Sequence, residues 1–180
     1  MDLREKKTKR SIQNAFLQLR AHKDLERITI KELAELAEIS KATFYLHYSD
    51  IYDLSDKISD EIIDEILKDT YNFENVGENP AAFTKKLLFS FHSKKALIDI
   101  VFSGSQSHVL PQKIEQALRE YIFEAKPSLR ENVNFNIALS FQIQGGYHAY
   151  IDNSSIFGTD VVSEVISNIA DNLKPYFLAT

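Results

Sequence analysis

The stretch Ile28–Tyr48 reads ITIKELAELAEISKATFYLHY and predicts two short helices separated by a sharp corner. Thr29 can cap the first helix with its hydroxyl, and Glu32 stands three residues later, where its carboxylate can return the bond to the start of the helix. The apolar face of this helix consists of Leu33, Ala34, Leu36 and Ala37. The helical period then breaks at residues 38–40, where neither glycine nor proline is present. The stretch therefore predicts a first helix that ends abruptly.

The second helix follows at once. Ser40 can cap it, and residues 42–48 can continue it. Phe44 is spaced to point inward, whereas the residues that can remain outside are Lys41, Thr43, Tyr45 and His47. Two helices joined by so short a corner predict a helix-turn-helix.

This stretch resembles the DNA-binding half of the TetR/AcrR family of transcriptional regulators, whose signature is roughly I-T-x-x-x-[IL]-A-x-x-A-G-[VI]-S-x-x-[TL]-[FL]-Y-x-[HY]-F. The residues that match in register are Ile28, Thr29, Leu33, Ala34, Ala37, Ile39, Ser40, Thr43, Phe44, Tyr45, His47 and Tyr48. The resemblance is specific over about residues 8–55 and only architectural beyond them.

The sequence departs from the family pattern at two positions. Glu38 replaces the usual corner glycine, so a small backbone strain is expected there if the corner needs a positive φ. Ile51 stands where many members carry a phosphate-binding lysine. The missing cation should lower affinity for the DNA backbone without removing base readout.

A short helix in the major groove presents its N-terminal side chains to base edges, here Lys41, Ala42 and Thr43. The resemblance implies that Tyr45 and His47 touch phosphates. The full set of candidate DNA-binding residues is Lys9, Lys31, Ser40, Lys41, Ala42, Thr43, Tyr45 and His47. The alternative for Tyr45 is a place in the core of the small helical domain. His47 could instead be a ligand or switch residue, although a phosphate donor is the plainer interpretation.

The net charge of −5 is unevenly distributed. Residues 1–48 hold ten Lys and Arg against seven Asp and Glu, a balance of +3, whereas residues 49–180 hold eleven against nineteen, a balance of −8. An acidic body would repel DNA, so the basic part must face the duplex. Five cations within residues 4–10 fit an arm or first turn lying against phosphates. The alternatives are a solvated helix start and a chance asymmetry of surface charge.

The spacing of apolar residues predicts an all-α fold of about nine helices, with no strand. We expect an N-terminal three-helix, homeodomain-like domain over residues 1–48, whose first helix runs from about Thr8 to His22. Residues 49–180 should form a C-terminal regulatory and dimerisation bundle that begins with a connecting helix over residues 49–68. Its later helices are expected at about 80–92, 97–103, 109–125, 133–151 and 161–177, with a loop at 72–79.

The last two helices are apolar over a wide arc, so one face can serve the core and another a partner. Gly145 and Gly146 inside a helix suggest a close backbone approach. In the resembled family these two helices form a four-helix bundle with a second subunit, which implies a two-fold homodimer. The candidate interface residues are Phe141, Gly145, Tyr150, Val162, Ile166, Ile169 and Leu173.

The C-terminal body of the family usually holds a small-molecule pocket. Candidate lining residues, which could equally be plain core, are Phe91, His92, Phe102, Tyr121, Phe141, Gln144, Tyr147 and His148. The resemblance thus implies a repressor that binds a palindromic operator as a dimer, with half-sites about 34 to 36 Å apart, and is released by an effector. The alternatives are activation and a body that binds a partner protein instead of a metabolite.

Several classes of protein are disfavoured. The chain has no cysteine, no run of 18 apolar residues and a polar N-terminus, so we expect a cytoplasmic protein without disulfides or a membrane span. The five histidines lack metal-ligand spacing, and no G-x-S-x-G or glycine-rich phosphate loop occurs. Ser103 and Ser105 have no base nearby in sequence. We therefore expect no catalysis, metal or cofactor.

Overall fold

The computed structural model describes residues 3–68 and 76–178, and over these residues it contains helices and no strand. The expected all-α fold is therefore confirmed. Eleven α-helical segments occur in the described residues, and a π-helical turn joins two of them, α8 (Val133–Ser140) and α9 (Gly146–Phe157), into one rod. Of the loop expected at 72–79, residues 72–75 lie outside the described part. No described helix has both the length and the apolar character that crossing a membrane requires.

The chain forms two compact units. The first unit comprises Met1–Ile62 and Lys95–His108, and the second comprises Ile63–Lys94 and Val109–Thr180. The first unit is thus larger than the expected domain of residues 1–48, because the N-terminal part of α4 and a later segment pack into it. Gln13 of α1 donates to the Glu61 carboxylate of α4 at 2.9 Å, which ties those two helices within the first unit.

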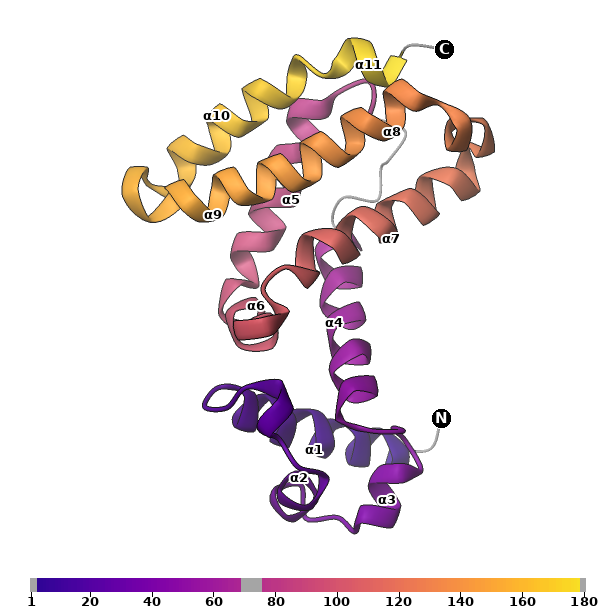
Figure 1. Cartoon of the computed structure of the whole chain (residues 1–180), viewed down its shortest axis with the longest axis vertical. Coiled ribbons are helices and arrows are strands. Elements are labelled where there is room, and N and C mark those ends of the chain that lie inside the picture. The colour runs from indigo at the N-terminus through magenta and orange to yellow at the C-terminus, as the bar shows by residue number, and fades with distance from the viewer. Residues whose placement is uncertain (1–2, 69–75, 179–180) are drawn as a thin grey trace. The chain divides into compact units, whose positions relative to one another are not determined.

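The first unit begins with three helices (Figure 1). Its elements are α1 (Leu3–Arg20), a 3₁₀ turn (Leu25–Arg27), α2 (Ile30–Leu36), α3 (Lys41–Tyr45), the start of α4 (Ile51–Lys68), α6 (Lys95–Val101) and a 3₁₀ turn (Gly104–Gln106). Helix α1 begins at Leu3 instead of near Thr8, so the cations of residues 4–10 stand on helix and not on an extended arm. The largest fully buried side chains of this unit include Ile12, Phe16, Leu33, Phe44 and Leu54.

Arg20 is a buried cation in the first unit, with only 3% of its surface exposed. Its guanidinium donates to the Lys23 carbonyl at 2.6 Å, the Ser103 hydroxyl at 2.8 Å and the Val101 carbonyl at 3.2 Å. These bonds attach the end of α1 to the segment after α6. Burial is the largest influence on Arg20 and lowers its pKa.

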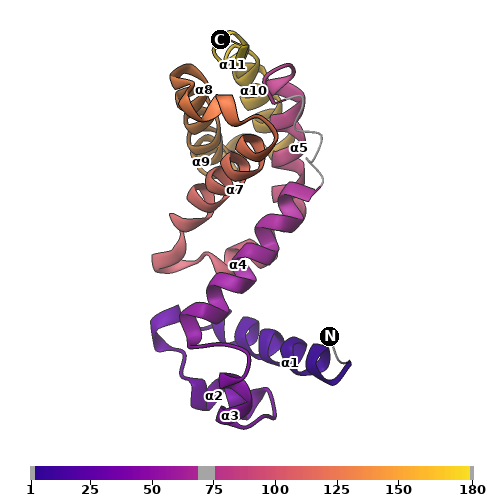
Figure 2. The same cartoon turned by 90° about the vertical axis from the view of Figure 1, so that its right-hand side faces the viewer.

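The second unit is a helical bundle (Figures 1 and 2). Its helices are the end of α4, α5 (Pro80–Ser93), α7 (Val109–Ala125), α8 (Val133–Ser140), α9 (Gly146–Phe157), α10 (Thr159–Asp171) and α11 (Lys174–Leu178). The rod of α8 and α9 runs beside α10, and Gly158, with φ of 87°, makes the turn between them. Side-chain oxygens of Asn79 and Asn132 cap α5 and α8.

The helix expected over residues 161–177 is divided in two. Helix α10 ends at Asp171, and α11 restarts at Lys174 with Pro175 in its first turn. Proline has no amide hydrogen to donate inside a helix but is tolerated in the first turn, which explains both the break and the restart.

Candidate nucleic-acid interface

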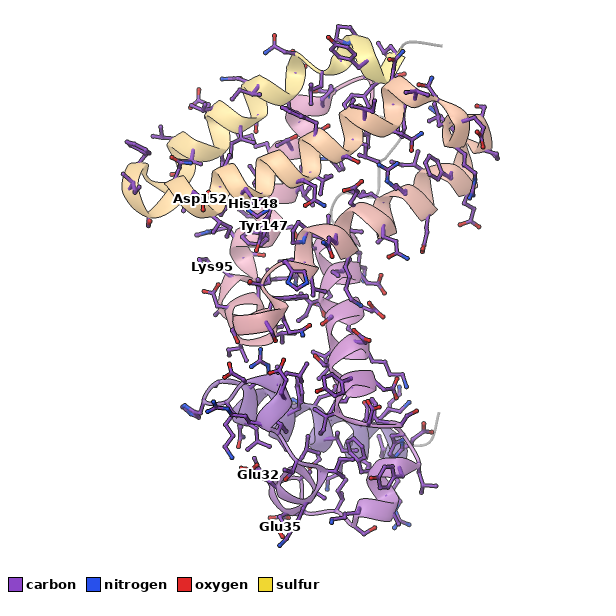
Figure 3. The ribbon with its side chains drawn as sticks, viewed as in Figure 1. Glu32, Glu35, Lys95, Tyr147, His148 and Asp152 are labelled. Atoms are coloured by element: carbon purple, nitrogen blue, oxygen red, sulfur yellow. The ribbon has the colours of Figure 1, made fainter. Side chains whose placement is uncertain are left out.

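Helix α2 is capped at Thr29, whose hydroxyl accepts the Glu32 amide at 3.3 Å. The Glu32 carboxylate pairs with the Lys23 ammonium group. Its neighbour on the next turn, Glu35, lies 4.0 Å from the Lys31 ammonium group. Glu32 and Glu35 both project from α2 (Figure 3). The predicted cap at Thr29 is confirmed, and Lys31 is exposed at the surface with an acidic neighbour.

The corner after α2 turns on Glu38, whose φ is 56°. The Glu38 amide donates to the Glu35 carbonyl at 3.2 Å, and the Ile39 amide reaches back to the Ala34 carbonyl at 3.0 Å. This pair of bonds is the Schellman ending, which requires a left-handed residue and is usually made by glycine. The positive φ predicted at Glu38 is confirmed. A side chain in this conformation costs about 1 kcal/mol.

Helix α3 starts at Ser40, whose hydroxyl accepts the Thr43 amide at 3.0 Å. Phe44 is fully buried, as predicted, and its ring contacts those of Tyr45 and Tyr48, each at 5.7 Å between centroids. The helix ends at Tyr45, earlier than the expected Tyr48, because the His47 amide donates to the Phe44 carbonyl three residues back instead of to the Thr43 carbonyl four residues back. Phe44 therefore fixes the orientation of the whole short helix.

The outer surface of α3 carries most of the predicted DNA-binding residues. Lys41 and Ala42 are exposed, Tyr45 is 57% exposed, and Thr43 and His47 are partly exposed. Tyr45 is therefore not a core residue; Tyr48 has that position, with 5% of its surface exposed. The structure brings together on this helix, its N-cap and the turn that follows it the residues Ser40, Lys41, Ala42, Thr43, Tyr45 and His47.

Two predicted contacts lie outside α3. Lys9 is half-buried on α1 and pairs with Glu5 at 3.3 Å, and Lys31 lies on α2. Ile51, at the position where the resembled family often has lysine, is 6% exposed. That position therefore belongs to the core of the first unit and provides no phosphate contact.

The start of α4 is fixed directly after α3. The Asp53 amide donates to the Asp50 carboxylate at 2.8 Å, and the Asp53 carboxylate accepts from the Ser49 amide at 2.8 Å. The bond from the Ser49 amide, followed by that from Lys57, lowers the pKa of Asp53. Burial, with help from nearby carboxylates, raises the pKa of Tyr48 to about 12. The Lys57 ammonium group also lies 5.1 Å from the centre of the Tyr48 ring. This cation–π contact helps to hold the start of α4 against the residues that follow α3.

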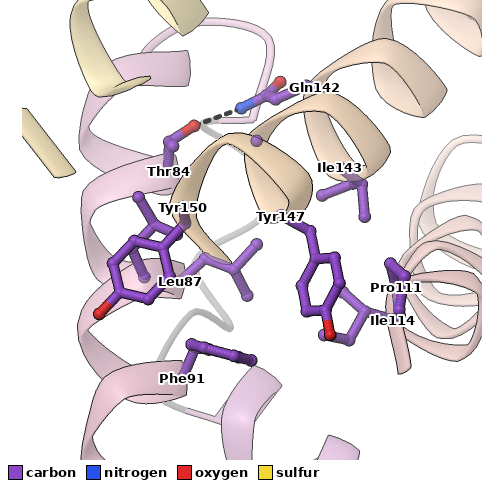
Figure 4. A pocket seen from close by; sticks show the side chains of 11 residues that line it. Thr84, Leu87, Phe91, Pro111, Ile114, Gln142, Ile143, Tyr147 and Tyr150 are labelled. Carbon is purple, nitrogen blue, oxygen red and sulfur yellow. Dashed lines mark hydrogen bonds between the residues drawn. The ribbon is translucent and has the colours of Figure 1, made fainter. Parts of the chain in front are cut away.

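The second unit contains a small apolar cavity of about 30 Å³ (Figure 4). Residues that line it include Thr84, Leu87, Phe91, Gln142, Tyr147 and Tyr150. Two of the eight predicted pocket residues, Phe91 and Tyr147, are among them, and their rings meet edge to face at 5.8 Å. The volume is about that of one water molecule in the liquid.

The other six predicted pocket residues lie elsewhere. Phe102 belongs to the first unit, and Tyr121 and Phe141 are exposed. Gln144 donates to the Glu115 carboxylate at 2.9 Å. The two histidines are also exposed: His92 lies 2.9 Å from the Tyr150 hydroxyl, and His148 stands on α9 beside Tyr147 (Figure 3). These residues do not form one site.

Gln142 is a cavity residue that no sequence pattern singled out. Its amide nitrogen donates to the Thr84 hydroxyl at 2.6 Å and faces the Pro80 carbonyl at 3.4 Å. A carbonyl can only accept, which fixes the orientation of the amide. The Gln142 carbonyl oxygen is buried and has no hydrogen-bond partner.

The predicted dimer residues divide between core and surface. Tyr150, Val162 and Ile166 are buried within the second unit, whereas Phe141 is 64% and Ile169 is 54% exposed. Gly145 is also exposed, and Leu173 is partly exposed. Tyr150, Val162 and Ile166 therefore have little side-chain surface left for a partner. We call five exposed apolar residues of α8, the π turn and α10 the apolar strip; they are Ile137, Phe141, Val161, Val165 and Ile169.

A groove of about 250 Å³ lies on the same part of the second unit. Its lining includes Phe141, Gly145, Ile166, Ile169 and Leu173. A Cβ atom added at Gly145 would meet nothing within 4 Å. The close approach expected at Gly145 is therefore not made within this chain, and the backbone there is open to a partner.

Comparison with models of known protein families and with curated proteins gave no match. In the described residues, no three His, Asp or Glu side chains gather where they could hold a metal ion. The surfaces that remain as candidates for function are the outer face of α3 in the first unit and the apolar strip in the second.

Proposed function

We propose that this protein is a TetR-like transcriptional regulator that binds a palindromic DNA operator as a homodimer. The observation that carries the proposal is the outer face of α3: buried Phe44 anchors the helix while Lys41 and Tyr45 stand exposed on its other side. A helix held in this way after a sharp corner is the arrangement in which helix-turn-helix proteins read the major groove.

Each exposed residue of α3 has a chemical role in this proposal. Lys41 would donate to the O6 and N7 acceptors of guanine, and Thr43 could offer its methyl group to thymine or its hydroxyl to a phosphate. Tyr45 and His47 would donate to phosphates and so fix the register of the protein on the duplex. Lys31 would exchange its exposed neighbour Glu35 for a phosphate.

The distribution of charge along the chain also supports DNA binding through residues 1–48. The balance of +3 over residues 1–48 favours a polyanion, and the balance of −8 over residues 49–180 opposes one. Because bound phosphates release counterions, affinity should fall as salt rises. Ile51 is buried and replaces a cation that the resembled family often uses. DNA affinity should therefore fall less steeply with salt concentration than is usual for regulators of that family.

The apolar strip supports a homodimer. Five large apolar side chains exposed on neighbouring helices form a patch that soluble proteins usually cover with a partner. A homodimer formed through this face would contain two copies of α3, as recognition of a palindrome with half-sites about 34 to 36 Å apart requires. Such binding would occlude a promoter, which favours repression.

An effector would act on the second unit. The cavity of about 30 Å³ is far smaller than the roughly 300 to 1,000 Å³ of typical ligand sites. Release by a metabolite bound in this cavity would therefore require a second state with a larger cavity, for which the ligand has higher affinity. A more open pocket of about 260 Å³, lined by His92, Tyr150 and Asp160 among others, lies elsewhere in the second unit. The small cavity, together with Phe89 at 75% exposure, also favours a second candidate: regulation by a partner protein bound to the second unit.

Selection of bound sequences from a library of random duplexes tests the proposal. We expect recovery of a palindrome whose half-sites lie about one helical turn apart. Recovery of no common sequence, under conditions where a known repressor yields its operator, would reject it.

A further inference from the structure

Leu46 is the most exposed large apolar residue of the first unit apart from Leu3 at the end of the chain, and 81% of its surface faces outward. It directly follows the last residue of α3, and its amide donates to the Ala42 carbonyl at 3.2 Å. The helical register therefore continues through Leu46. Residues four apart in a helix share a face, so Ala42 and Leu46 form one exposed apolar surface.

The fold of the first unit does not account for Leu46. Phe44 provides the anchor of α3, and an exposed leucine adds little to the stability of the unit while leaving apolar area in water. Directly before Ala42 and Leu46 in the chain, exposed Lys41 and Tyr45 provide polar contacts of the kind that phosphates and base edges accept. An apolar surface beside them suits an apolar partner in the same groove.

The major groove of B-form DNA offers one such partner, the C5-methyl group of thymine. With a rise of 1.5 Å per residue, Leu46 lies about 6 Å further along the helix than Ala42. Both side chains therefore fit within a groove about 12 Å wide when α3 enters it.

We propose that Leu46, together with Ala42, reads the C5-methyl group of thymine in each half-site. This inference rests on the DNA-binding function proposed above and adds a specificity-determining residue to it. Lys41 then selects a base pair by hydrogen bonding, and Leu46 selects a nearby one by apolar contact. Because 5-methylcytosine carries its methyl group at the same ring position, it should replace thymine as the apolar partner of Leu46.

The test uses the full-length protein and the operator recovered by selection. Each thymine is replaced in turn by deoxyuridine, symmetrically in both half-sites, which removes the methyl group and leaves the Watson–Crick and groove hydrogen-bonding groups unchanged. Burial of one methyl group predicts a loss of affinity of about four-fold per half-site, or about fifteen-fold for the pair, at the position that Leu46 reads. Leu46→Ala should bind the thymine and uracil duplexes within about two-fold of each other at that position.

Leu36→Ala is the matched control. Leu36 is also an exposed apolar residue, at 45%, but it lies on α2. This variant should keep the full preference for thymine, and circular dichroism should show that both variants retain the helical fold of the wild type.

Different outcomes would contradict the proposed DNA-binding function and the proposed role of Leu46. If the protein prefers no sequence, the DNA-binding function itself is wrong, and the inference falls with it. If it binds a preferred sequence but no thymine-to-uracil change weakens binding, or Leu46→Ala keeps the full penalty, only the role of Leu46 is wrong. Restoration of affinity by 5-methylcytosine in a cytosine-substituted site, for the wild type and not for Leu46→Ala, supports the inference.

Discussion

The Ser40 hydroxyl accepts the Thr43 amide at 3.0 Å and lies 2.8 Å from the Thr43 hydroxyl. Helix α3 has only five residues, Lys41–Tyr45, and a helix of that length is not stable in water by its own hydrogen bonds. The cap at Ser40 and the buried ring of Phe44 therefore hold the candidate DNA-reading face in shape.

Replacement of Ser40 by alanine should lower the free energy of unfolding by about 1 kcal/mol, because the Thr43 amide loses its acceptor. Urea denaturation followed by circular dichroism measures the change. Ser40→Asp is the control, because aspartate also caps helices but adds negative charge where DNA would bind. It should keep the wild-type stability and lose DNA affinity. An unchanged midpoint for Ser40→Ala would mean that the cap does not stabilise α3.

Replacement of Glu38 by glycine should stabilise the protein by about 0.5 to 1 kcal/mol, because glycine adopts the positive φ without steric cost. Part of the gain is offset by the greater freedom of glycine in the unfolded chain. Glu38→Ala removes the same charge but keeps the strain, so it should remain close to the wild type. Equal urea midpoints for the glycine and alanine variants would show that the corner carries no strain.

Glu115 should make the second unit sensitive to acid. Burial raises its pKa, but bonds from Ser140 at 2.5 Å, Gln144 at 2.9 Å and Arg119 at 2.7 Å lower it by more, so the pKa lies below the ordinary value of 4.5. The ionised form is thus favoured in the folded state. Its contribution to stability is complete above about pH 4.5 and is lost as the pH falls through the folded-state pKa.

Glu115→Gln should therefore lower the free energy of unfolding at neutral pH by about 1 to 3 kcal/mol, because charged hydrogen bonds are lost. The difference from the wild type should shrink as the pH falls below about 4.5, because the unfolded chain then binds a proton at Glu115 while the folded protein does not, and it should be lost once the pH passes below the folded-state pKa. Urea titrations of the wild type and of Glu115→Gln at several pH values from 7 to 3 give the free energy of unfolding of each protein as a function of pH. A difference that stays constant over this range would show that the Glu115 charge does not contribute.

The apolar strip predicts that the protein is a homodimer. Ile169→Glu and Phe141→Glu place a charge at positions that are 54% and 64% exposed in the single chain but would be buried in a dimer. Both variants should be monomers of about 20.6 kDa by sedimentation at micromolar concentration, where the wild type has twice that mass. Phe89→Glu, at a 75% exposed position on α5, should remain a dimer. A dimeric Ile169→Glu, or a monomeric wild type, would contradict this assignment.

The corner could be predicted from the sequence because its hydrogen bonds join residues close together in the chain. The cap at Thr29 spans three residues, the cap at Ser40 spans three, and the strain at Glu38 follows from bonds within one turn. Periodicity also identified buried Phe44. Helix ends were less predictable: a run of charges and polar residues gave no sign that α1 begins at Leu3.

Contacts between distant segments could not be predicted. Arg20 binds Ser103, and Gln142 binds Thr84, across long intervals of sequence that no local pattern connects. The sequence of the last two helices predicted a wide apolar arc but not which of its side chains face inward, because large apolar residues are found in cores and in interfaces alike. Only packing separates buried Tyr150 from exposed Ile169. For the same reason, only two of the eight predicted pocket residues line the cavity.

The central claim is that the outer face of α3 reads DNA sequence twice per assembly. The most direct test is the ratio of dissociation constants for the selected palindrome and for a duplex of equal composition with shuffled order, measured at one salt concentration near 150 mM. We expect a preference for the palindrome of at least about 10³-fold, the usual margin of specific over non-specific binding. Equal affinity for the two duplexes would contradict it.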